Sequence, residues 1–257
     1  MWRILTTIML LWVPGKLGAS TVKAPVEKQI ITVMVIDTGI DPTHPLLKDH
    51  ITSDGSGDYV PSQDHGTHVA GIILHGNKMF RTKDGLDGRD SVCPEVQLIS
   101  CKYYSKGQSG SETLAKEVNC IERAIRLKTD FINISGGGTQ FSVSELQAVR
   151  AYTAQGGVIF AAAGNESSNM DSEPYYPASY GFTNKVPKIY AVQNIQADGK
   201  KGPSSNTHPY ALTEVGTDVW SAKPGGEYRQ MTGTSQATPS VLHLFLKQKC
   251  ADLYQKR

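Results

Sequence analysis

The chain has 257 residues, of which 39% are hydrophobic, so it is long enough to enclose a large core in one domain. Its formal net charge of +2 comes from 26 basic and 24 acidic residues spread along the sequence without a basic run. This distribution excludes the electrostatic pattern of a nucleic-acid-binding protein, and no apolar stretch is long enough for stable membrane insertion.

Residues 1–20 have the pattern of a secretory signal peptide. Arg3 precedes an apolar run from Ile4 to Val13, and a region of small residues ends at Ser20. We therefore expect a secreted or periplasmic protein whose folded domain is 21–257; a simple N-terminal extension containing Lys16 is the alternative. Only about ten residues separate Ser20 from the first strand, too few for a folded prodomain. The mature chain is expected to begin near Ser20 without self-cleavage.

Five apolar, β-branched runs are each typical of a strand buried on both faces of a parallel sheet. They are residues 30–36, 96–103, 131–134, 158–163 and 189–195.

Two helices are predicted between these strands. In the first, Ser109 and Glu112 have the spacing of a capping box, as do Ser142 and Glu145 in the second, which should end near Gly156. The apolar face of the first helix consists of Leu114, Val118, Ile121 and Ile125.

This alternation predicts an α/β fold with a doubly wound, mainly parallel sheet and helices on both faces. Ligands of such folds bind at the carboxyl ends of the strands. The four cysteines allow three pairings, and their spacing matches no metal motif. The sequence does not choose among these pairings, which require an oxidising compartment. Because buried cysteine behaves as a small hydrophobic residue, we interpret the four as buried free thiols, with disulfides as the alternative. They are Cys93, Cys101, Cys120 and Cys250.

Three polar residues at strand ends or helix starts could together perform acyl transfer. Asp37 ends the first strand in VIDTG, His65 begins HGTHVAG, and Ser235 lies in GTSQATP at the start of a final helix. Serine would be the nucleophile, histidine the general base, and aspartate the anion that orients the imidazole.

Each motif alone has another interpretation. DTG also marks aspartic proteases, but the chain has no second DTG. His65 and His68 could bind zinc, yet HGTH lacks the glutamate and spacing of HExxH. Ser235 could be only a helix cap, and Asn165 only a turn residue.

Taken together and in this order, VIDTG, HGTHVAG, AAAGN and GTSQATP resemble the subtilisin-like serine proteases, the subtilases, over about residues 30–244. The resemblance implies a serine endopeptidase with Asp37, His65 and Ser235 as its triad. It makes His68 structural and makes Asn165 an oxyanion donor beside the backbone N–H of Ser235. No cofactor is required for this chemistry, and we expect a monomer.

The resemblance also implies an extended polypeptide substrate that pairs as a strand with Ser135, Gly136 and Gly137. Tyr175 stands where many relatives keep a glycine, so we expect a shallow primary pocket that takes small or slender side chains. Asp171 and Glu173 nearby leave a basic preference as the second possibility. Another wall of the primary pocket is expected from Ala162, Ala163 and Gly164. Pro177 matches a proline that is cis in relatives.

Several positions depart from the family pattern. Leu46 replaces a frequent calcium-ligating aspartate, so no metal site is assigned. Asp84, Asp87 and Asp90 could bind calcium but are interpreted as a solvated acidic turn.

The serine helix also differs, since Ser240 to His243 replace the small residues that usually follow Pro239, and the chain stops soon afterwards at Arg257. These departures support two alternatives: a catalytically silent subtilase fold that binds peptides, or a truncated and unstable product.

Overall fold

The structure, a computed structural model, describes residues 29–53, 58–60, 63–77, 80–82, 85–87 and 90–255. The predicted signal peptide at 1–20 lies outside these residues. Within the described ranges, no helix combines the length and the apolar character needed to cross a bilayer.

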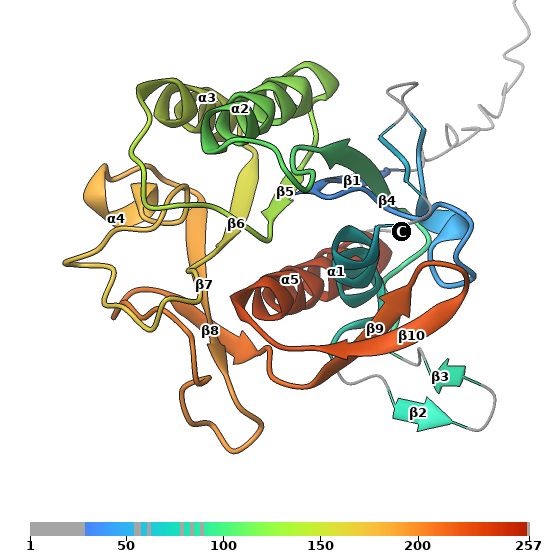
Figure 1. Cartoon of the computed structure of the whole chain (residues 1–257). Helices are drawn as coiled ribbons and strands as arrows, with labels where there is room; N and C mark the ends of the chain where they lie inside the picture. The colour runs from blue at the N-terminus through green and yellow to red at the C-terminus, as the bar shows by residue number, and fades with distance from the viewer. Residues whose placement is uncertain are drawn as a thin grey trace, which may run out of the picture.

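The centre of the molecule is a six-stranded parallel sheet with the strand order β4-β1-β5-β6-β7-β8 (Figure 1). The five predicted strands all form, with ends shifted by at most one residue, and β8 is an addition that the sequence analysis did not predict. The strands are β1 (Ile31–Asp37), β4 (Val96–Lys102), β5 (Phe131–Ile134), β6 (Val158–Ala162), β7 (Ile189–Ile195) and β8 (Leu212–Val215).

Helices cover both faces of this sheet, as predicted. Alternate residues of β1 face opposite sides, so Val33 and Val35 pack with α1 (Asp64–His75) and α5 (Thr234–Gln255), whereas Met34 and Ile36 pack on the other side. That second side is covered by α2 (Gly110–Leu127) and α3 (Val143–Ala154), drawn above the sheet in Figure 1. The doubly wound α/β fold is therefore confirmed.

Shorter elements complete the structure. They are the 3-10 turn η1 (Lys48–His50), the helix α4 (Tyr180–Thr183), the hairpin of β9 (Val219–Lys223) with β10 (Glu227–Met231), and the hairpin of β2 (Phe80–Thr82) with β3 (Gly85–Asp87).

The strand order creates a crevice beside β1. From β1 the chain adds β4 on one side, and it then crosses to place β5 on the other side of β1. Loops that leave β1 and β5 therefore diverge at the carboxyl edge, which is where doubly wound sheets bind ligands.

The two predicted capping boxes have different outcomes. Ser109 and Glu112 form the complete box at the start of α2. At the start of α3, the Ser142 hydroxyl accepts from the Glu145 backbone N–H at 3.3 Å, but the Glu145 carboxyl is bonded elsewhere, to the Tyr180 hydroxyl at 2.6 Å. The prediction of a second complete capping box was therefore wrong. The Ser142 cap forms, but the Glu145 side chain points into the protein and does not bond back to the Ser142 backbone.

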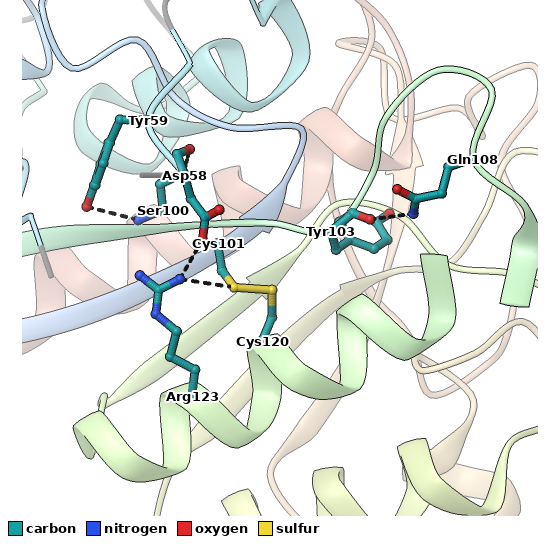
Figure 2. The surroundings of a disulfide bond; sticks show 8 residues. All are labelled: Asp58, Tyr59, Ser100, Cys101, Tyr103, Gln108, Cys120 and Arg123. Atoms are coloured by element: carbon teal, nitrogen blue, oxygen red, sulfur yellow. Dashed lines mark hydrogen bonds and ion pairs between the residues drawn. A yellow bond between two sulfur atoms is a disulfide. The ribbon is translucent and has the colours of Figure 1, made fainter. Parts of the chain in front are cut away.

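The interpretation of the cysteines as free thiols was wrong. Cys93 pairs with Cys250, and Cys101 pairs with Cys120, with Cα–Cα distances of 5.7 and 5.8 Å. The pairing depends on contacts across the fold that spacing does not reveal. Figure 2 shows the second disulfide linking β4 to α2, with the Arg123 guanidinium 3.5 Å from the Cys101 sulfur.

The altered serine helix still packs against α1. His243 contributes a hydrogen bond across the contact, with its Nδ1 3.0 Å from the Ile73 carbonyl oxygen, and the Ser240 hydroxyl donates within the helix to the Gln236 carbonyl at 2.8 Å. Both polar side chains are buried, and each has a hydrogen-bond partner.

Candidate active site

Asp37 and His65 are in direct contact. Asp37 ends β1 with 2% of its side chain exposed, and His65 lies in the first turn of α1 with 35% exposed. The His65 Nδ1 is 2.8 Å from Asp37 Oδ1, which also accepts from the Thr38 backbone N–H at 2.7 Å. The negative charge of Asp37 raises the pKa of His65 above 6.5, although burial opposes this. The carboxylate therefore fixes the ring and stabilises its protonated form.

Ser235 and Ser135 are joined by two reciprocal hydrogen bonds. The Ser235 hydroxyl donates to the Ser135 carbonyl at 2.8 Å, and the Ser135 hydroxyl donates to the Ser235 carbonyl at 2.9 Å. These bonds tie the start of α5 to the end of β5. The Ser235 hydroxyl is turned toward Ser135 and not toward His65, so a rotation about χ1 is needed to give a bond between nucleophile and base.

Asn165 follows β6 beside the start of α5. Its Oδ1 accepts from the Thr234 backbone N–H at 3.0 Å and lies 3.3 Å from the Thr234 hydroxyl. Because the oxygen end is held in this way, the amide NH₂ is the end that can donate. The backbone N–H of Ser235 lies in the first turn of the same helix, where donors are unsatisfied and the helix dipole is positive.

His68 has a structural environment. It is fully buried, and its Nε2 lies 3.1 Å from the carbonyl oxygens of both Val219 and Arg229. Burial lowers its pKa to about 4, so the ring is neutral. Because Nε2 is bonded to the β9–β10 hairpin, these contacts argue against the zinc alternative with His65.

The acidic turn that contains Asp84, Asp87 and Asp90 is described only in part. Asp84 lies outside the described residues, as does the side chain of Asp87. The Asp90 carboxylate is bonded to the Lys247 ammonium at 2.7 Å, and Leu46 packs against the core. In the described portion of the chain, no group of three or more His, Cys, Asp or Glu side chains could hold a metal ion.

The Tyr175 ring lies between two glycines of the expected substrate-binding segments. A Cβ atom added to Gly137 or Gly164 would approach the ring to 2.7 or 2.8 Å. The side chains of Ala162 and Ala163 are buried. The Tyr176–Pro177 bond is cis, as the resemblance implied.

A cavity of about 630 Å³ extends from Asp37 and His65 along the Ser135–Gly137 segment. Further walls come from the loop after β4, from α2 and α3, and from the segment before α4. The lining side chains used below are Tyr103, Tyr104, Leu114, Glu117, Glu145 and Tyr175.

The sequence analysis missed Glu117 and misassigned Glu145. Glu117 is three residues after Leu114 and four before Ile121, so it lies on the helical face identified as apolar and is 3% exposed. An acidic residue within an apolar stripe was the available signal. Glu145 is 2% exposed and had been assigned only to a cap.

The chain is similar to proteins of known class. The family model described as "Subtilase family" matches residues 28–249. The "Major intracellular serine protease" of Bacillus subtilis (strain 168) is 33% identical over 243 residues, which cover 87% of this chain and 72% of the relative. "Subtilisin amylosacchariticus" of Bacillus subtilis subsp. amylosacchariticus is 34% identical over 239 residues, 87% of this chain but only 58% of that relative.

Solved structures have the same fold. A cold adapted subtilisin-like serine proteinase has a TM-score of 0.69 and 25% identity, with 87% of this chain and 77% of that chain covered. The prenylagaramide maturation protease PagA has a TM-score of 0.65 and 25% identity, with 85% and 76% covered.

Proposed function

This chain belongs to the subtilase family of serine-type endopeptidases, and from this premise we propose that it hydrolyses peptide bonds with Asp37, His65 and Ser235 as catalytic triad. The observation that carries the proposal is the 2.8 Å contact between Asp37 and His65. It gives a polarised base at the edge where Ser235 begins its helix.

In this mechanism the Ser235 oxygen attacks the carbonyl carbon while His65 accepts the hydroxyl proton. The tetrahedral oxyanion is stabilised by the Asn165 amide and the Ser235 backbone N–H. His65 then donates the proton to the leaving amine, and water hydrolyses the acyl-enzyme by the same steps.

The Ser235 hydroxyl must first leave the Ser135 carbonyl. A substrate that adds as a strand along Ser135–Gly137 would bring its own backbone N–H to that carbonyl. We propose that substrate binding displaces the Ser235 hydroxyl and so couples peptide binding to alignment of the nucleophile.

The primary pocket is proposed to favour small or slender side chains, because the Tyr175 ring occupies the space between Gly137 and Gly164. The second possibility, a basic preference from Asp171 and Glu173, has less support. Asp171 lies 3.0 Å from the His208 Nε2, and neither acid lines the cavity.

A fluorophosphonate probe tests the triad, because only an activated serine reacts with it. We expect labelling of the wild type and of Ser172→Ala, an exposed-serine control, and none of Ser235→Ala. Asn165→Leu should lower kcat on the order of a hundredfold to a thousandfold, since one oxyanion donor is lost. A folded wild type that is not labelled would support peptide binding without hydrolysis.

We further propose that the protein matures in an oxidising compartment. Two disulfides are typical of exported proteins, and residues 1–20 have the signal-peptide pattern. One relative is named an intracellular protease, so the family does not determine the location. Alkylation of free thiols before lysis, followed by mass spectrometry, should find all four cysteines blocked in exported protein. Protein that is found only in the cytosol, with its cysteines reduced, would contradict the proposed oxidising compartment.

A further inference from the structure

Two buried carboxyl groups meet inside the substrate-binding cavity. Glu117 comes from α2 and Glu145 from α3, and their side chains share a hydrogen bond. Glu145 also accepts from the Tyr180 hydroxyl at 2.6 Å. The remaining oxygen of Glu117, Oε1, is buried and has no hydrogen-bond partner among the described residues. Neither carboxyl forms an ion pair with any residue in the described ranges.

A purely structural role does not explain this arrangement. Burial raises the pKa of both glutamates, which favours a proton shared between them. A buried acceptor without a donor costs free energy, and an apolar pair of similar volume would hold α2 against α3 at least as well. Glu117 lines the cavity that also contains Asp37 and His65, so a group that enters with the substrate can approach this carboxyl and supply the missing donor.

The walls of the cavity near the two carboxyls suit a long basic side chain. Tyr103, Tyr104, Leu114 and Tyr175 provide apolar and aromatic surface along the cavity. The methylene stem of lysine or arginine packs on such surface, and its cationic head interacts favourably with both aromatic faces and carboxylates. Tyr104 is 44% exposed, so one aromatic ring is accessible from solvent.

The carboxyls lie on a different side of the sheet from the catalytic helices. α2 and α3 cover one face, whereas α1 and α5, which carry His65 and Ser235, cover the other. The residue at the scissile bond is expected beside Tyr175. Because Tyr175 restricts the primary pocket to small or slender side chains, we assign the long side chain that reaches Glu117 to a different residue of the bound strand.

We propose that Glu117 and Glu145 form an acidic subsite that binds a lysine or arginine side chain of the peptide substrate, at a position not adjacent to the scissile bond. This inference rests on the proposed peptidase function. The bound cation replaces the shared proton, which leaves to solvent, and satisfies Oε1 of Glu117. Selectivity for a basic side chain is then set at this subsite, because Tyr175 restricts the primary pocket to small or slender side chains.

Peptides with one fixed cleavage site test the subsite. Each position away from the scissile bond carries in turn lysine, leucine, arginine or citrulline, which is the uncharged isostere of arginine. The value of kcat/KM is measured for every peptide. We expect one position where lysine exceeds leucine, and arginine exceeds citrulline, by tenfold or more. Glu117→Gln and Glu145→Gln should bring both ratios near one. Glu122→Gln, on the exposed side of α2, should leave them unchanged.

Two outcomes would overturn the proposal: no position prefers a basic residue, or the preference survives in Glu117→Gln. A variant that fails to show cooperative unfolding is replaced by Glu117→Leu, which places an apolar group of similar size there. A ratio between two peptides on one enzyme is insensitive to a general loss of activity, so a merely structural role would not change it.

Binding separates this inference from the proposed hydrolysis. In the Ser235→Ala variant, the Kd of fluorescent lysine and leucine peptides is measured by polarisation. If the wild type cleaves nothing but Ser235→Ala binds the lysine peptide tenfold more tightly, the catalytic proposal fails and the subsite stands. Equal Kd values, or binding of neither peptide, would refute the subsite.

Discussion

Removal of each disulfide should destabilise the fold to a different extent. The perturbation is a pair of double variants, Cys93→Ala/Cys250→Ala and Cys101→Ala/Cys120→Ala. All four cysteines are between 2% and 7% exposed, so the loss of buried sulfur is similar in the two variants. The disulfides differ mainly in the length of chain that they close, with sequence separations of 157 and 19.

In the chain-entropy model these loops correspond to a stabilisation of about 5 kcal/mol for Cys93–Cys250 and about 3 kcal/mol for Cys101–Cys120 at 25 °C. The constant part cancels in the comparison. The term 1.5RT ln n leaves a difference of about 2 kcal/mol, with the longer loop contributing more.

The assay is urea unfolding followed by circular dichroism, in a Ser235→Ala background so that proteolysis does not interfere. The free energy of unfolding should fall further for Cys93→Ala/Cys250→Ala, which releases the end of α5 from the segment before β4. Equal losses, or a larger loss for Cys101→Ala/Cys120→Ala, would refute the entropic reasoning and point to local contacts, such as that of Arg123 with Cys101.

Three further perturbations test the site. Because Asp37 raises the pKa of His65, kcat should rise with pH around a midpoint above 6.5. The variant Asp37→Asn should shift that midpoint downward and lower kcat on the order of ten-thousandfold. An unshifted midpoint would assign the titration to another group. Tyr175→Gly should increase kcat/KM for cleavage after phenylalanine relative to alanine, and no increase would mean that the ring does not fill the pocket. EDTA should leave Tm unchanged since Lys247 is bonded to Asp90, whereas a loss of Tm that Ca²⁺ restores would contradict this.

Local patterns in the sequence were sufficient to predict the elements that position the site. The strand before Asp37 is identifiable because a strand buried on both faces must be apolar throughout. The box of Ser109 and Glu112 depends on residues three apart, so no tertiary information is needed. β8 escaped prediction because its residues are half-exposed and contain Glu214, which interrupts any apolar run.

The candidate site could be assembled from motifs, but its contacts could not. Asp37 and His65 are 28 residues apart, and their roles follow from the resemblance of VIDTG and HGTH to a family pattern. The reciprocal bonds between Ser135 and Ser235 join residues 100 apart. Nothing in either segment indicates that the hydroxyl of Ser235 is turned to a backbone carbonyl.

By itself, the sequence determined the α/β class, the order of the strands along the chain and the identity of the residues proposed for catalysis, because each depends on short-range periodicity or on a contiguous motif. Only the tertiary structure decided which cysteines pair and that Glu117 and Glu145 are buried together in the substrate cavity. The physical reason is that a disulfide and the burial of a charge depend on which distant segments pack against each other. In the sequence, Glu117 differs from a solvent-exposed helical glutamate only by its place within an apolar stripe, and it is the packing of α2 against α3 that buries it beside Glu145.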